Sequence, residues 1–232
     1  MTTDYGLRIT DYGPRTIHIE ACRRILYDHV AEMRVIGGIH RGRTLRTVGG
    51  LAVRPTSDRL RETLFNILAP RIDGSRFLDI CAGSGAVGIE ALSRGASEVT
   101  FIERSRYACA AIDANLASLG IDPETPETPE TPETPETPET MIVNREATAS
   151  LKRLDRESRR FDIIFFDPPY ASQLYIQVMN QLGSGNLLAN EGLVIVEHRA
   201  KTPPAPEYEK LRIFREVKQG ESGLAFYETL PD

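Results

Sequence analysis

The sequence predicts an α/β protein built on a mostly parallel, doubly wound sheet. Short apolar segments alternate with amphipathic ones between residues 76 and 166, as expected when a helix follows each parallel strand. A chain of 232 residues is long enough for one such domain with a small appendage. Its hydrophobic fraction of 41% and charged fraction of 26% are ordinary for globular proteins and argue against collagen-like, mostly disordered and membrane classes.

The cysteines and the apolar runs exclude further classes of protein. The three cysteines are scattered without a C-x-x-C pair, so we expect neither a metal site nor a disulfide framework. No apolar run approaches the roughly 18 residues that a membrane span needs. The first residues lack the apolar core of a secretory signal, so we expect a cytoplasmic protein without a membrane partner.

Residues 1–32 differ in character from the rest of the chain. Residues 4–10 are nearly repeated by residues 11–17, and neither copy is clearly amphipathic. We expect residues 1–32 to be an appendage that is either disordered or the product of an upstream start. A helix over residues 19–31 that docks on the core is the alternative. Residues 33–232 would then form the main domain.

The main domain opens with a short basic hairpin. Its strands are expected at residues 34–36 and 44–48, with turn glycines between them. Residues 56–58 offer N-caps for an amphipathic helix that carries Leu60, Leu64, Phe65 and Leu68. We then expect strands at 76–80, 98–102, 141–143 and 162–166, with helices at 87–94, 107–119 and 147–155. Strands at 193–197, 212–217 and 223–229 complete a seven-stranded sheet that ends in an antiparallel hairpin.

Residues 123–140 are six tandem Pro-Glu-Thr units. A proline in every third position removes backbone donors and fixes φ, so we expect a disordered, extended loop. The loop follows a helix and precedes a strand, and should therefore leave the sheet at the amino ends of the strands. Ligands bind such sheets at the carboxyl ends.

The chain contains a basic segment whose charge is offset in the net charge by the acidic Pro-Glu-Thr loop. The formal net charge is −5, but the loop alone contributes six glutamates. Residues 33–62 hold seven arginines against two acidic residues, and we expect this segment to contact a phosphate backbone. A solvated basic face is the alternative, as is bracing of the helix by the last three arginines. The predicted RNA-binding residues are Arg34, Arg41, Arg43, Arg46, Arg54, Arg59 and Arg61.

A glycine-rich loop lies between the first predicted core strand and its helix. Gly83, Gly85 and Gly88 form G-x-G-x-x-G, which is compatible with a dinucleotide fold. Asp79 favours S-adenosylmethionine instead, because dinucleotide enzymes usually keep that strand end apolar. Its carboxylate could bind the α-amino group of the methionine, and Glu103 could accept from both ribose hydroxyls. Helix capping and a plain surface charge are the alternative roles.

The strongest functional pattern is Asp167-Pro168-Pro169-Tyr170, directly after a buried strand. The prolines lock the backbone, so the Asp167 side chain and the Pro168 carbonyl can face one point as two acceptors. Two acceptors on an exocyclic amine favour the geometry that attacks a sulfonium methyl group. Tyr170 can stack on a flipped base. A proline turn with an incidental aspartate is the alternative.

Together these residues resemble the RsmD-type bacterial methyltransferases. The resemblance runs from Met33 to about Tyr227 and rests on residues 33–38, 41–43 and 54–68, the loop at 78–88, residues 167–170 and residues 223–227. It implies a class I S-adenosylmethionine-dependent methyltransferase fold, which is Rossmann-like. It also implies methylation of the N2 amine of a guanine in 16S ribosomal RNA, with S-adenosylhomocysteine as product and the small ribosomal subunit or its RNA as partner.

The resemblance also implies the site residues. The catalytic clamp would be Asp167, Pro168, Pro169 and Tyr170. Cofactor residues would be Asp79, Ala82, Gly83, Ser84, Gly85 and Glu103, with Glu146 and Ala147 at the adenine, where the family usually has Asp-Ala. Cys81 stands where the family commonly has phenylalanine, and we expect it to be a packing residue. We expect a monomer.

Three other functions fit parts of the pattern. An adenine-N6 methyltransferase acting on DNA or RNA would use the same clamp and differ only in product. A nicotinamide oxidoreductase is opposed by Asp79 and the clamp. A ribosome-assembly factor that binds RNA without turnover would have no need of an intact clamp.

Overall fold

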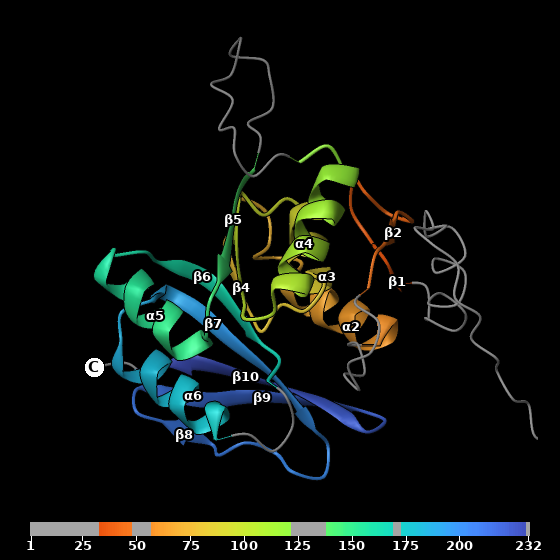
Figure 1. Cartoon of the computed structure of the whole chain (residues 1–232). Coiled ribbons are helices and arrows are strands. Elements are labelled where there is room, and N and C mark those ends of the chain that lie inside the picture. Colours follow the sequence, from red (N-terminus) through yellow and green to blue (C-terminus); the bar gives the residue numbers. More distant parts are fainter. Residues whose placement is uncertain (1–32, 48–56, 122–137, 169–172, 231–232) are drawn as a thin grey trace, which may run out of the picture. The chain divides into compact units, whose positions relative to one another are not determined.

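The computed structural model describes residues 33–47, 57–121, 138–168 and 173–230, and Figure 1 shows how their elements are arranged. Predictions that concern residues 1–32, Arg54, most of the Pro-Glu-Thr tract, Pro169 and Tyr170 lie outside the described residues. No helix in the described ranges is long and apolar enough to cross a membrane.

The core is a single eight-stranded sheet with the order β5-β4-β3-β6-β7-β10-β9-β8. From β5 to β7 neighbouring strands are parallel, whereas β10, β9 and β8 join antiparallel, which confirms the predicted α/β topology. The strands are β3 (Arg76–Ile80), β4 (Glu98–Glu103), β5 (Glu139–Asn144), β6 (Phe161–Phe166), β7 (Leu188–Arg199), β8 (Glu207–Tyr208), β9 (Leu211–Gln219) and β10 (Ser222–Thr229). The sheet has one strand more than predicted, because β8 is only two residues long and leaves no periodic pattern in the sequence.

Helices cover both faces of the sheet, as Figure 1 shows. One buried cluster joins the sheet to α2 (Asp58–Leu68), α3 (Ala86–Ser93) and α4 (Arg106–Ser118), and a second joins it to α5 (Ala147–Arg156) and α6 (Leu174–Ser184). Ser57 caps α2 as predicted, since its hydroxyl accepts from the backbone N–H of Leu60. The predicted elements did not include α6.

Strand β5 begins inside the Pro-Glu-Thr tract, so the predicted loop boundary at residue 140 is wrong. Glu139 and Thr140 pair with Glu98 and Val99 of β4, and Thr140 is buried. The guanidinium of Arg159 donates to the carboxylates of both Glu98 and Glu139, which offsets the repulsion between these paired acids. No proline follows residue 138 here, so the backbone donors that a strand needs are present.

The basic hairpin forms, but its strands β1 (Met33–Arg34) and β2 (Thr44–Leu45) are shorter than predicted. A buried carboxylate fixes it to α3. The backbone N–H groups of Ile36 and Gly37 donate to the two oxygens of Glu90, each over 2.7 Å. Glu90 also accepts from Arg94 over 2.7 Å and lies 3.9 Å from the fully buried guanidinium of Arg61. The hairpin is therefore part of the core.

The close approach of the hairpin to α3 explains its second turn glycine. Gly38 has φ +75°, and a Cβ atom there would lie 1.7 Å from the Ser93 carbonyl oxygen. The Ser93 hydroxyl donates to the Gly37 carbonyl over 2.6 Å. Only glycine fits this contact.

Replacing Glu90 with alanine should destabilise the fold strongly. The change removes the partner of a buried arginine, and breaking a buried ion pair by removing one member costs about 3–5 kcal/mol. We expect this loss in the free energy of unfolding, measured by urea denaturation. Glu157→Ala is the matched control, because its pair with Arg153 is exposed and should matter by less than about 0.5 kcal/mol. Equal stability of the two variants would contradict this role of Glu90.

Candidate functional site

The candidate site lies at the carboxyl ends of the central parallel strands. Asp79 lies in β3, Asp167 follows β6, and Glu197 lies near the end of β7. Phe165 and Ile195 pack beneath α2, α3 and α4, and side chains alternate along a strand. Asp79, Asp167 and Glu197 therefore stand on the face of the sheet that these three helices cover.

The glycine loop connects β3 to α3 at this edge. The backbone N–H groups of Cys81 and Ala82 both donate to the carbonyl of Ile102, over 2.9 and 3.1 Å, so the loop follows the end of β4. Gly83 has φ +57°, and a Cβ atom there would meet nothing within 4 Å, so open space adjoins the loop. A Cβ atom on Gly88 would lie 2.3 Å from the ring of Phe101. Gly88 thus allows α3 to pack on β4.

Cys81 behaves as the packing residue that was predicted. Burial, followed by the neighbouring carboxylates of Glu103 and Asp167, raises the pKa of its thiol far above the ordinary value. The thiol therefore stays protonated at neutral pH. A protonated thiol is a poor nucleophile.

Asp79 is a buried carboxylate that faces the loop. Its Oδ2 accepts from the backbone N–H of Gly88 over 2.9 Å, in the first turn of α3. Burial raises the pKa of Asp79 to about 7, and the charge of Glu103 adds to this, whereas the bond from Gly88 opposes it. Asp79 therefore performs the helix capping that was considered as an alternative. A carboxylate has further lone pairs with which to bind a ligand.

Glu103 holds the same loop from the neighbouring strand. Its carboxylate accepts from Gly83 N–H over 3.0 Å and from Ser105 N–H over 2.8 Å. The side chain is half-buried. Glu103 thus binds the loop at Gly83, while Asp79 binds the first turn of α3 that follows it, at Gly88.

Glu146 and Ala147 lie one strand further along. Glu103 pairs with Asn144 of β5, and Glu146 follows two residues later as the N-terminal flank of α5. The Glu146 carboxylate lies 3.6 Å from the guanidinium of Arg104 and is exposed, whereas Ala147 is buried.

The predicted clamp begins where β6 ends. The backbone N–H of Asp167 donates to the carbonyl of Ile80 over 3.3 Å, which joins the ends of β6 and β3, and Pro168 is buried. Burial raises the pKa of Asp167 well above its ordinary value, and the charges of Glu197 and Asp79 add to this. Beyond the clamp, the ring of Tyr175 packs on Phe166 with 5.8 Å between the centroids.

The predicted RNA-binding arginines fall into two groups. Five are exposed, namely Arg34, Arg41, Arg43, Arg46 and Arg59, although Arg34 lies 3.8 Å from Asp58 and Arg43 also donates to the carbonyl of Ser118. Arg61 is a correction: its side chain has no exposed surface and is held by Asp58, the carbonyl of Arg34 and nearby Glu90. Arg61 is thus structural, as in the bracing alternative, although that alternative named Glu62 or the C-terminal strands as partners and the partners found are Asp58, Arg34 and Glu90.

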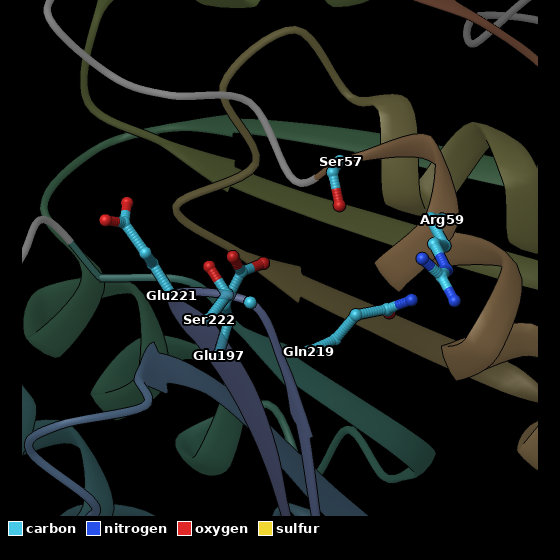
Figure 2. A pocket seen from close by; sticks show the side chains of 7 residues that line it. Ser57, Arg59, Glu197, Gln219, Glu221 and Ser222 are labelled. Carbon is cyan, nitrogen blue, oxygen red and sulfur yellow. The ribbon is translucent and has the colours of Figure 1, made fainter.

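A pocket beside the clamp was not predicted. It has a volume of about 300 Å³ and is lined by Ser57, Arg59, Glu197, Gln219, Gly220, Glu221 and Ser222. Figure 2 shows Ser57 and Arg59 at the start of α2 on one side and Glu197, Ser222 and Gln219 on the other. The sequence predicts a strand through Glu197 but no role for it. A charged residue near the end of an apolar strand, as at Asp79, was the available signal.

The described residues contain no group of three or more His, Cys, Asp or Glu side chains that could hold a metal ion.

Comparisons with known proteins agree with this architecture. The model of the family described as conserved hypothetical protein 95 matches residues 33–228. Ribosomal RNA small subunit methyltransferase D of Escherichia coli K12 is 35% identical over 207 residues, covering 82% of this chain and 93% of that protein. The protein of the same name from Haemophilus influenzae is 36% identical over 172 residues, covering 74% and 81%.

Solved structures show the same fold. The Escherichia coli protein yhhF has a TM-score of 0.69 at 35% identity, with 86% of this chain and 99% of that chain covered. The Thermus thermophilus 16S rRNA N2 G1207 methyltransferase has a TM-score of 0.57 at 20% identity, with 78% and 44% covered, and shows a shared fold only. The predicted methyltransferase fold is thereby confirmed.

The Asp79→Asn variant should gain stability relative to the parent protein as the pH rises. Between the ordinary carboxyl pKa near 4 and about 7, Asp79 keeps its proton in the folded protein but releases it in the unfolded chain. The free energy of unfolding of the parent therefore falls as the pH rises through this range. Asparagine does not titrate and still accepts from Gly88. The stability of the variant relative to the parent should therefore rise by roughly 1.4 kcal/mol per pH unit between about pH 5 and 7.

Urea denaturation between pH 5 and 8 measures this difference. Asp162→Asn is the matched control, because hydrogen bonds from Arg76 lower the pKa of Asp162. Its effect should be constant over this range. A constant difference for Asp79→Asn as well would show that Asp79 is ionised throughout.

Proposed function

The chain belongs to the conserved hypothetical protein 95 family, that of the RsmD-type methyltransferases, and from this membership we propose that it methylates the N2 amine of a guanine in small-subunit ribosomal RNA. S-adenosylmethionine is the proposed methyl donor, and residues 33–232 are the proposed methyltransferase domain. The observation that carries the proposal is the placement of Asp167, at the end of β6 beside the glycine loop.

The residues around the loop fit S-adenosylmethionine. Open space adjoins Gly83, so a ligand can approach the backbone closely. Asp79 offers a carboxylate to the amino group of the methionine, and half-buried Glu103 offers one to the ribose hydroxyls. Glu146 and Ala147 are proposed to contact the adenine. The bound group supplies an electrophilic methyl carbon on a sulfonium.

Asp167 and Pro168 are proposed to act on the acceptor amine. The Asp167 carboxylate and the Pro168 carbonyl accept from the two amine hydrogens and thereby aim the nitrogen lone pair at the methyl group. Aligned polar groups of this kind are worth about 3–4 kcal/mol in a transition state. Burial and then the nearby carboxylates raise the pKa of Asp167, so it is also a suitable acceptor for the proton that the methylated nitrogen releases. Pro169 and Tyr170 complete the proposed clamp.

Exposed arginines are proposed to hold the RNA. Arg34, Arg41, Arg43 and Arg46 lie on the hairpin, and Arg59 lies on the rim of the pocket. Arginine contacts to phosphates position an RNA, while base identity is read elsewhere. We propose that the protein acts as a monomer.

Asp167→Ala should abolish most turnover and spare cofactor binding. The variant loses one acceptor for the amine, so kcat should fall by about a hundredfold or more. The enzyme is incubated with undermodified small ribosomal subunits and methyl-labelled S-adenosylmethionine. Digestion of the RNA to nucleosides then gives the rate and identifies the product. Calorimetry should find S-adenosylmethionine affinity within about threefold of the parent.

Asp113→Ala, an exposed change on α4, is the control and should leave the rate unaltered. Unchanged turnover by Asp167→Ala would rule out the clamp. Label in N6-methyladenosine instead of N2-methylguanosine would favour the adenine alternative.

Reversing the charge of Arg41 and Arg46 together should weaken RNA binding. Each phosphate contact releases counterions, so losing two should lower the slope of log K against log salt by about one to two units. Filter binding between low and moderate salt measures the slope. Arg153 and Arg156, exposed on α5, give a control pair with the same change in net charge. Equal slopes for both variants would place the RNA surface elsewhere.

A further inference from the structure

Exposed arginines gather at the carboxyl ends of β4 and β5. The side-chain amide of Asn144 donates to the carbonyls of Glu103 and Arg104 over 3.1 and 3.0 Å, and the N–H of Arg145 donates to the Glu103 carbonyl over 3.2 Å. These bonds tie the two strand ends together. Arg104, Arg106 and Arg145 are all exposed, so three positive charges lie at this end of the sheet.

Tyr107 lies next to these arginines, in the first turn of α4. The hydroxyl of Ser105 caps the helix by accepting from the N–H of Ala108 over 3.4 Å, and the N–H of Ser105 donates to Glu103 over 2.8 Å. The start of α4 is therefore held in place by its own hydrogen bonds, while Tyr107 is 84% exposed. A tyrosine ring loses only two side-chain rotations when it is covered, so a ring in this position suits stacking.

The cluster lies on the same face of the sheet as the clamp. The helix α4 covers the face on which Asp79 and Asp167 stand, and only β3 separates β4 from β6. Neighbouring strands are about 4.8 Å apart, so the ends of β4 and β6 are about 10 Å apart. About three stacked nucleotides of one strand span that distance. A strand whose acceptor base reaches Asp167 can therefore also reach Tyr107.

We propose that Arg104, Arg106, Tyr107 and Arg145 hold the RNA strand beside the acceptor nucleotide, with one base stacked on the ring and phosphates on the arginines. The proposal rests on the proposed function and adds a second RNA surface to that of the hairpin. The cluster binds and positions the RNA, and it takes no part in methyl transfer.

The chemistry of the cluster suits RNA better than the cofactor. S-adenosylmethionine carries a sulfonium and no phosphate, so it has no use for three arginines near its ribose. RNA supplies a phosphate for a guanidinium and an aromatic base for a tyrosine ring. Arg104 lies 3.6 Å from the Glu146 carboxylate, but both side chains are exposed, so the pair is weak and the guanidinium stays accessible.

Tyr107→Ala tests the stacking. Filter binding to undermodified small ribosomal subunits should show an affinity about fivefold lower or less, because a base stacked on an aromatic ring contributes at least that much. KM for the subunits should rise by a similar factor, with kcat within about twofold of the parent. Calorimetry should find S-adenosylmethionine affinity within about twofold. Tyr107→Phe keeps the ring and should restore most of the lost affinity.

Phe214→Ala is the matched control, because it removes an exposed ring from β9, near the other end of the sheet. It should leave RNA affinity unchanged. Urea denaturation shows that each variant is folded before its affinity is compared. An equal loss of affinity in Phe214→Ala would contradict a specific role of Tyr107.

Arg106→Gln combined with Arg145→Gln tests the phosphate contacts. Losing two contacts should lower the slope of log K against log salt by about one to two units. Arg153→Gln combined with Arg156→Gln, on α5, removes the same charge from another exposed surface and should keep the slope of the parent.

Three results would overturn the inference while the parent enzyme still makes N2-methylguanosine. The first is parent RNA affinity in Tyr107→Ala. The second is weakened S-adenosylmethionine affinity in that variant, which would assign the ring to the cofactor. The third is an unchanged salt slope in the Arg106 and Arg145 variant, which would indicate a protein contact. Label on another base in the parent reaction would instead overturn the proposed function.

Discussion

The site depends on one buried carboxylate in the central strand. Asp79 binds the first turn of α3 through Gly88, and Glu103 of the neighbouring strand binds the loop through Gly83. The loop is therefore held from two strands, with its open side facing outward. Burial at Asp79 costs stability, as its raised pKa shows. A structure that needed only a helix cap could use an uncharged residue, and we propose that the carboxyl group of Asp79 is kept to bind the methyl donor.

A second buried carboxylate, that of Glu90, positions the start of α2 beside the pocket. Glu90 binds the hairpin backbone and lies beside Arg61, and Arg61 donates to both Asp58 and the carbonyl of Arg34. These contacts hold the first turn of α2 against the hairpin and α3. The rim of the pocket begins in that same turn. The basic segment thus has two roles, because one arginine orders the scaffold while its neighbours remain at the surface.

Hydrophobic patterns in the sequence were sufficient to predict those helices and strands that bury one regular face. Alternation and helical spacing located β3, β4, β6, α2 and α4 within a few residues. They failed for β8, which is too short to repeat, and at the start of β5, where tertiary pairing draws residues 139 and 140 out of a proline-rich repeat. Arg61 and Glu197 show the limit for sites. The burial of a charged residue is decided by how the surrounding elements pack, which the sequence pattern does not contain. Arg61, which is structural, was therefore predicted to be a surface residue, and no role was predicted for the buried pocket residue Glu197.

We propose that charge in the assembled site orients an entering nucleotide. Asp79, Asp167 and Glu197 line the interior with carboxyl groups, and exposed arginines such as Arg59 make the rim cationic. Phosphates are attracted to the arginines of the rim, whereas an amine can donate to the carboxyl groups of the interior. Burial, followed by the charge of Glu197, disfavours ionisation of Asp167 and so raises its pKa, and a hydrogen-bond donor that reaches the Asp167 carboxylate offsets part of that cost.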